Sequence, residues 1–181
     1  MLPEISLNVL DIAQNSIKAG AKLVEIEVSR MRQDKTMTLS INDDGCGMDA
    51  EQLERVIDPF FTSRTTRKIG LGVPFLKQAA EASGGSFRIT SEVNKGTQVF
   101  ATFHTDHIDC MPLGDINSTI FSLVTMNEDL DFVYTYRVDQ KEFTLDTREI
   151  REILGNVSFQ NADVTAFLRE YLSENQLEVE Q

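Results

Sequence analysis

The 181-residue sequence has few features of a secreted or membrane-bound protein. Its two cysteines, Cys46 and Cys110, are too few and too far apart to suggest a disulfide scaffold. No run approaches the roughly 18 apolar residues that are needed to span a bilayer. The N-terminus, MLPEISLNVLDIAQNS, lacks the basic start and long apolar stretch of a secretion signal. These absences predict a cytoplasmic protein with reduced thiols and no membrane partner.

Positive charge is scarce, and the shortage is concentrated late in the chain. The formal net charge is -12. Residues 1–103 hold 12 Lys+Arg against 13 Asp+Glu, which leaves -1, whereas residues 104–181 hold 5 against 16, which leaves -11. Because an acidic surface repels phosphate backbones, nucleic acid is not expected as a partner. The nearly balanced first part can still hold a local basic site.

Strong metal and mononucleotide motifs are also missing. The sequence has no G-x-x-x-x-G-K-[ST], and no G-x-G-x-x-G follows a predicted strand. His104, His107 and Cys110 are spaced by three residues, but three candidate ligands without a second pair make a weak zinc signal. We interpret this segment as a polar connector, with a zinc site as the alternative.

Hydrophobic periodicity predicts alternating helices and strands in the first part of the chain. The first helix is expected to bury Leu10, Ala13 and Ile17. The predicted strands alternate apolar with mostly polar residues, so each buries one face. Helices are expected over 7–19, 51–57 and 74–83, and strands over 23–30, 36–42, 86–91 and 97–103.

Residues 104–172 are predicted to form an acidic α/β extension packed on a first domain of residues 1–103. The segments DFVYTYRV and KEFTL are strand-like, and we expect one of them to complete the sheet of the first domain. Asp146 with Glu149 forms a capping-box pattern, and Asn161 can cap a last helix. Only residues 173–181 are expected to be a flexible tail.

Three polar residues of the first helix point to phosphate chemistry. Asp11, Asn15 and Lys18 follow i, i+4, i+7 spacing and therefore share one helix face. An amide oxygen is a hard ligand suited to Mg²⁺, an ammonium suits a phosphate, and a carboxylate can orient or deprotonate an attacking group. The alternative is an ordinary solvated helix face.

The stretch DDGCGMD, residues 43–49, predicts contact with a flat ligand. The Asp43 carboxylate is only an acceptor, so it can bind the exocyclic amine of adenine but would meet a carbonyl oxygen on guanine. Gly45 and Gly47 lack the side chains that would hold a ligand away from the backbone. The alternative is a surface turn.

The start of the Pro74 helix is a candidate phosphate site. Gly70 and Gly72 open this helix, whose first backbone amides form a natural anion site. Arg64, Arg67 and Lys68 lie just upstream and can reach the same phosphates. A flexible basic loop is the alternative.

In order and spacing these segments resemble the GHKL superfamily, which includes gyrase-type topoisomerases, heat-shock chaperones, histidine kinases and MutL proteins. LDIAQNSIKAGA resembles the N box, DDGCGMD the G1 box, DPFFTSR the F box, GLGVPFLKQAAEASGG the G2 box, and NKGTQVFATF the closing strand. The resemblance implies an α+β fold, a two-layer α/β sandwich with a mixed sheet known as the Bergerat fold. It also implies ATP as ligand, with Mg²⁺ on Asn15, adenine on Asp43 and Thr97 near the base. The implied ATP-binding set is Asn15, Lys18, Asp43, Gly45, Gly47, Met48, Arg64, Lys68, Gly70, Leu71, Gly72, Val73 and Thr97.

Asp11 stands where hydrolysing relatives carry a catalytic Glu and where many histidine kinases carry Asn. Since Asp is one methylene shorter, we expect slow hydrolysis. The N box begins within ten residues of Met1, so the phosphoacceptor is expected on a partner protein. The sequence therefore predicts a regulatory kinase or ATPase. The alternatives are an ATP-dependent switch without catalysis, or a subunit that docks through its C-terminal part.

Overall fold

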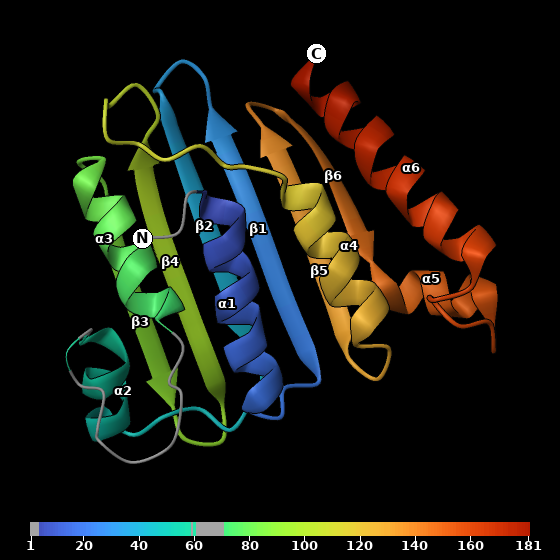
Figure 1. The fold of residues 1–181 in the computed structure, drawn as a ribbon, viewed down its shortest axis with the longest axis horizontal. Coiled ribbons are helices and arrows are strands. Elements are labelled where there is room, and N and C mark those ends of the chain that lie inside the picture. The colour runs from blue at the N-terminus through green and yellow to red at the C-terminus, as the bar shows by residue number, and fades with distance from the viewer. Residues whose placement is uncertain (1–3, 59, 61–70) are drawn as a thin grey trace.

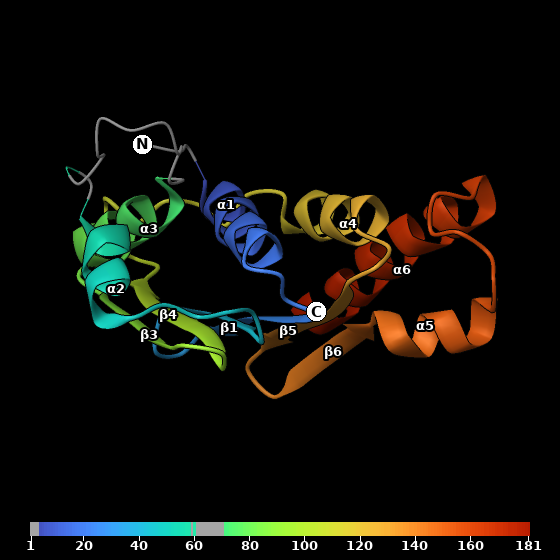
Figure 2. The same ribbon diagram turned by 90° about the horizontal axis from the view of Figure 1, so that it is seen from below.

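The computed structural model describes residues 4–58, 60 and 71–181. Within this part of the chain, a six-stranded mixed sheet has the strand order β3-β4-β2-β1-β5-β6. Helices α1, α3 and α4 lie side by side over one face of the sheet (Figures 1 and 2). This two-layer arrangement confirms the predicted α+β sandwich. No helix of the described residues combines the length and apolarity needed to cross a membrane.

The elements follow one another in the order helix, hairpin, two helices, hairpin, helix, hairpin and two helices. They are α1 (Ile5–Lys18), β1 (Leu23–Met31), β2 (Thr36–Asp43), α2 (Ala50–Ile57), α3 (Gly72–Ala82), β3 (Ser86–Glu92), β4 (Gly96–His104), α4 (Ile116–Met126), β5 (Asp131–Val138), β6 (Lys141–Asp146), α5 (Thr147–Leu154) and α6 (Ala162–Glu180).

Alternation along the strands decides which sheet face is covered. Val24, Ile26 and Val28 of β1 are each at most 2% exposed and lie under the helices. The residues between them are polar and lie on the opposite face, as expected for a sheet packed on one side. All neighbouring strands are antiparallel except β1 and β5. A parallel pair needs a crossover connection, and the segment containing α4 provides part of it.

The buried face of α1 is rotated from the expected stripe. Ala13 is buried as predicted, but Leu10 and Ile17 are only partly buried and line a shallow groove between α1 and α4. The buried residues of α1 are instead Ile5, Ser6, Asn8, Val9, Ile12, Ala13 and Ser16. The expectation failed because α4, which was not predicted, packs against the flank of α1 that carries Leu10 and Ile17.

The C-terminal part completes the sheet, which confirms the expectation for DFVYTYRV. Strand β5 pairs in parallel with β1 over its full length, and β6 pairs with β5. The connector before α4 also joins the start of α1, where the backbone amides of Ile5 and Ser6 donate to the carbonyls of Pro112 and Leu113. The expected domain boundary at residue 103 therefore marks a change in charge, but the sheet continues across it.

The chain end differs from the expected flexible tail over residues 173–181. Helix α6 continues to Glu180, and Val179 is 5% exposed. The Tyr136 hydroxyl donates to Glu180 Oε1 at 2.6 Å, and Arg30 contacts the same oxygen at 3.4 Å. Burial opposes ionisation of Glu180, but these hydrogen bonds and positive charges lower its pKa overall. The tail is ordered because its last turn has apolar and polar partners on β1 and β5.

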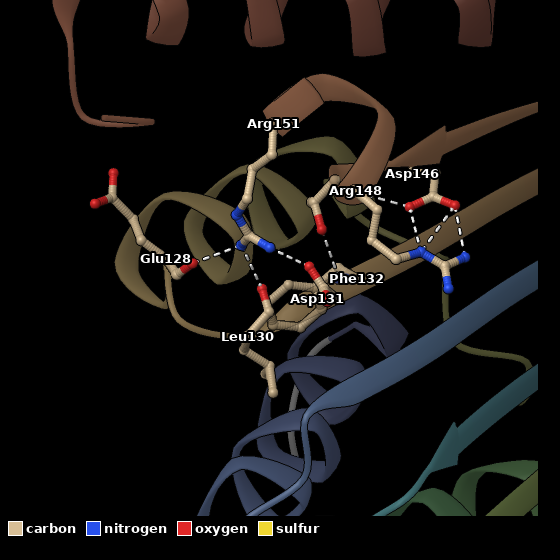
Figure 3. A network of polar contacts seen from close by, with 8 residues as sticks. Glu128, Leu130, Asp131, Phe132, Asp146, Arg148 and Arg151 are labelled. Carbon is tan, nitrogen blue, oxygen red and sulfur yellow. Dashed lines mark hydrogen bonds and ion pairs between the residues drawn. The ribbon is translucent and has the colours of Figure 1, made fainter. Parts of the chain in front are cut away.

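Helix α5 is held to the beginning of β5 by an arginine cluster (Figure 3). The Arg151 guanidinium pairs with Asp131 and donates to the carbonyls of Glu128 at 2.5 Å and Leu130 at 2.9 Å. Asp146 caps the helix by accepting from the backbone amide of Arg148, so the reciprocal contact with Glu149 expected for a capping box is not formed.

Candidate functional site

A cavity of about 770 Å³ opens between the helix layer and the sheet. The end of α1, the start of α3 and the end of β2 meet at this end of the sheet, beside α2 (Figure 1). Its volume lies within the range typical of small-molecule sites. The lining residues are Ile12, Asn15, Ser16, Lys18, Ala19, Ile41, Asp43, Gly47, Met48, Val56, Val73, Ile89, Thr97 and Val99.

Asp43 lies at the end of β2, where β1 and β4 hold it from both sides. It is opposite Val24 of β1 and Thr97 of β4. Its Oδ2 accepts a hydrogen bond from Ser16 Oγ at 2.6 Å, and its Oδ1 accepts one from the Gly45 backbone amide at 2.9 Å. A carboxylate has about four acceptor positions, so two remain for a ligand.

The two glycines of the G1 box are also required by the packing of the loop. A Cβ on Gly45 would meet the Ala19 side chain at 2.9 Å, and one on Gly47 would meet the Glu92 carbonyl oxygen at 2.0 Å. Gly47 also has a φ of +66°, which favours glycine. Gly47 lines the cavity, whereas Gly45 is buried against α1. Both positions need glycine because the loop packs tightly against neighbouring protein segments.

The polar face of α1 divides into two parts. Asn15 and Lys18 line the cavity, and their side chains form no hydrogen bond or ion pair with any described residue. Asp11 does not line it. Its Cβ lies 2.6 Å from the position that a Cβ on Gly72 would occupy, so Asp11 packs against the first turn of α3. Sequence spacing predicted the shared face correctly, but not the part of it that α3 covers.

The start of α3 supplies backbone donors close to the cavity. Helix α3 begins at Gly72, and no side chain of the described residues caps its first turn, so the amides of Gly72 and Val73 are available to an anion. Val73 in this turn lines the cavity, while Leu71 is exposed. The predicted phosphate ligands Arg64, Lys68 and Gly70 lie outside the described residues.

Ser91 is a site residue that the sequence did not reveal. Its hydroxyl accepts from the Met48 backbone amide at 2.8 Å and lies 2.9 Å from Thr97 Oγ1. Ser91 Oγ also lies 2.9 Å from the Gly96 carbonyl oxygen. This hydroxyl therefore joins the G1 box to the β3–β4 hairpin and fixes both Met48 and Thr97 at the cavity.

Most of the apolar wall of the cavity was not predicted, since only Met48 and Val73 of its residues belong to the implied ATP-binding set. Ile41 lies two residues before Asp43, and Val99 lies two residues after Thr97, so each shares a sheet face with its polar neighbour. Ile12 and Val73 close the wall from the helix layer. The period-two pattern contained this information, because side chains two positions from a strand-end site residue face the same way.

The segment from His104 to Cys110 has no metal-like geometry. Among the residues that the structure describes, no group of three or more His, Cys, Asp or Glu side chains is placed to hold an ion. The His107 backbone amide donates to the His104 carbonyl, and the Cys110 amide donates to the His107 carbonyl. Burial raises the pKa of the Cys110 thiol, which disfavours the thiolate that a metal requires.

The chain matches known proteins over the same region. Residues 3–107 match the family described as histidine kinase-, DNA gyrase B-, and HSP90-like ATPase. Sporulation kinase D of Bacillus subtilis is 32% identical over 94 residues, which cover 52% of this chain and 18% of the kinase. The histidine-protein kinase ArlS of Staphylococcus aureus is 33% identical over 88 residues, or 46% of this chain and 20% of that protein. The chain thus matches a fifth or less of these relatives' lengths.

A solved structure shows the same fold at low identity. The ATPase domain of Aquifex aeolicus MutL, solved in complex with ADP, aligns with a TM-score of 0.53 and 14% identity. The alignment covers 85% of this chain and 70% of that domain. Because residues 1–107 make up less than 85% of the chain, the likeness extends beyond residue 107.

Proposed function

Because this chain belongs to the histidine kinase-, DNA gyrase B- and HSP90-like ATPase family, we propose that it binds Mg²⁺-ATP and acts as a regulatory kinase or ATPase on a partner protein. The observation that carries the proposal is the position of Asp43 in the cavity. This carboxylate is fixed by two hydrogen bonds, lies beside an apolar wall, and retains acceptor capacity. An adenine ring has the matching chemistry, namely an apolar face and an exocyclic amine.

The helix-layer side of the cavity fits the rest of the nucleotide. Asn15 presents an amide that has no partner among the described residues and that suits Mg²⁺, and Lys18 presents an ammonium for phosphate oxygens. The first amides of α3 would bind the same phosphates. When bound, Mg²⁺ would neutralise phosphate charge and polarise the phosphoryl group.

Asp11 is the candidate group for the acceptor. Its carboxylate shares a helix face with Asn15 and forms no hydrogen bond with any described residue. It would orient a water molecule or an acceptor hydroxyl or imidazole from the partner. Its place against Gly72, outside the cavity lining, favours a second candidate function, in which bound ATP changes docking of the C-terminal part without turnover.

Calorimetry with ADP, ATP and GTP in the presence of Mg²⁺ tests nucleotide recognition. We expect adenine-selective binding that Asp43→Ala weakens at least about tenfold, because a charged hydrogen bond is lost. Asp44→Ala is the matched control, since the Asp44 carboxylate accepts from the Lys22 and Leu23 amides. Equal binding of GTP, or equal losses in the two variants, would refute adenine recognition by Asp43.

Turnover separates the two candidate functions. Radiolabelled ATP is incubated with the protein alone and with extract from its native cell, and Asp11→Asn is compared with the unmodified chain. Loss of hydrolysis or phosphotransfer in the variant, with binding retained, supports a kinase or ATPase. If nucleotide binds but no condition produces turnover, the switch is the better description.

A further inference from the structure

Ser16 lies in the last turn of α1, on the side that faces the end of β2. It is 2% exposed, and its hydroxyl oxygen lies 2.6 Å from Asp43 Oδ2 and 3.4 Å from the Ile12 carbonyl oxygen. A serine within a helix can donate to the carbonyl four residues earlier. Here that contact is long, whereas 2.6 Å is typical of a hydroxyl donating to a charged carboxylate. The single hydroxyl proton therefore goes to Asp43.

This hydrogen bond fixes the carboxylate from the helix side. The Gly45 amide holds Oδ1 within the strand-end turn, and Ser16 holds Oδ2 from α1. The terminal torsion of an aspartate is broad, so one bond alone would leave the carboxylate plane free to turn. Two donors on different segments restrict the plane, and they also determine which lone pairs face the cavity.

We propose that Ser16 is a positioning residue for base selection, which holds Asp43 in the orientation that accepts a hydrogen bond from an exocyclic amine. The inference rests on the proposed adenine nucleotide binding. Ser16 does not itself bind the amine in this account. Its effect passes through Asp43 and is confined to ligands that carry an amino group at the purine 6-position.

The same helix provides a matched comparison. Ser6 is 1% exposed, and its hydroxyl has no hydrogen-bond partner in the part of the chain that the structure describes. Replacing either serine by alanine removes one buried hydroxyl from α1, but only Ser16→Ala removes a contact with Asp43. Ser6→Ala therefore controls for the general cost of the substitution.

The test measures binding of ADP and of purine riboside 5′-diphosphate, which lacks the 6-amino group, to each protein. We expect Ser16→Ala to weaken ADP binding about tenfold and to change binding of the analogue less than about twofold. Ser6→Ala should leave both affinities unchanged. A thermal melt of each variant confirms that it is folded before titration.

The outcomes separate this inference from the proposed function. If the unmodified chain shows no preference for ADP over GDP, the proposed adenine recognition fails and the inference falls with it. If that preference is present but Ser16→Ala binds ADP normally, or loses ADP and the analogue equally, only the positioning role is overturned. A loss confined to ADP supports it.

Discussion

Replacing each of two tyrosines on one strand by phenylalanine should change the free energy of unfolding in opposite directions. Tyr134 and Tyr136 of β5 point to the same face and are at most 1% exposed. Tyr134 Oη has no hydrogen-bond partner within residues 4–58, 60 and 71–181, whereas Tyr136 Oη donates to Glu180 Oε1 at 2.6 Å. Burial raises the pKa of both hydroxyls, so both remain neutral at ordinary pH. Replacing either residue by phenylalanine removes one oxygen atom and nothing else.

The expected magnitudes follow from the contacts. An unsatisfied buried polar group costs about 1–3 kcal/mol, so Tyr134→Phe should raise the free energy of unfolding by about 1 kcal/mol. Loss of a hydrogen bond to a charged group costs about 1.5–3 kcal/mol, which we reduce to about 1 kcal/mol because the Glu180 side chain is 33% exposed. For a chain of this size, 1 kcal/mol corresponds to roughly 2–4 °C in Tm.

Urea unfolding followed by circular dichroism gives both free energies, and a thermal melt gives the two Tm shifts. The slope of the free energy of unfolding against urea concentration should be the same for the unmodified chain and both variants, since neither substitution alters the surface exposed on unfolding. The difference between the variants should be about 2 kcal/mol, with the two signs opposed. If Tyr134→Phe destabilises as much as Tyr136→Phe, the Tyr134 hydroxyl has a partner and the reasoning is refuted.

Three further perturbations test the packing around the site and at the chain end. Gly47→Ala should lower the free energy of unfolding by more than about 2 kcal/mol, because its Cβ would lie 2.0 Å from a hairpin carbonyl oxygen. Gly20→Ala, measured by the same urea titration, should cost only about 1 kcal/mol, since φ there is +73° but no atom lies within 4 Å. Asn8→Leu should raise Tm, because the Asn8 amide is buried and neither of its polar atoms has a partner among the described residues. Because the pKa of Glu180 is lower in the folded protein than the ordinary glutamate pKa, its carboxylate stabilises the fold at pH above that ordinary pKa. This contribution should disappear as pH falls below the ordinary pKa and through the lowered one. A Glu180→Gln variant should therefore lose less stability than the unmodified chain over the same acid titration.

Local patterns predicted the polar residues of the site, because their spacing is set by one element. The positions of Asn15 and Lys18 follow from helical periodicity, and Asp43 follows from the end of an alternating strand. For the two glycines, the structure adds a packing reason that the sequence did not reveal. Their need for glycine comes from Ala19 and Glu92, which lie far away in sequence and close only after folding.

Features created by distant partners were beyond the same reasoning. Helix α4 was not predicted, although its residues Ile120 and Leu123 are buried. Because α4 was missing from the prediction, the buried face of α1 was assigned incorrectly. The last turn of α6 looked polar enough to fray. Its order depends on Tyr136 and Arg30, which are 44 and 150 residues away in sequence from Glu180.

The sheet register explains why the candidate site and the acidic C-terminal part form one unit. Asp43 lies opposite Val24 on β1, and Val24 lies opposite Phe132 on β5. Without residues after 103, β1 would become an edge strand, and its covered face would lose the packing of Phe132 and Tyr134. The first amides of α1 would also lose the carbonyls of the connector. Since α1 carries Asn15, Ser16 and Lys18, the same contacts hold the C-terminal part to the helix that forms one wall of the cavity.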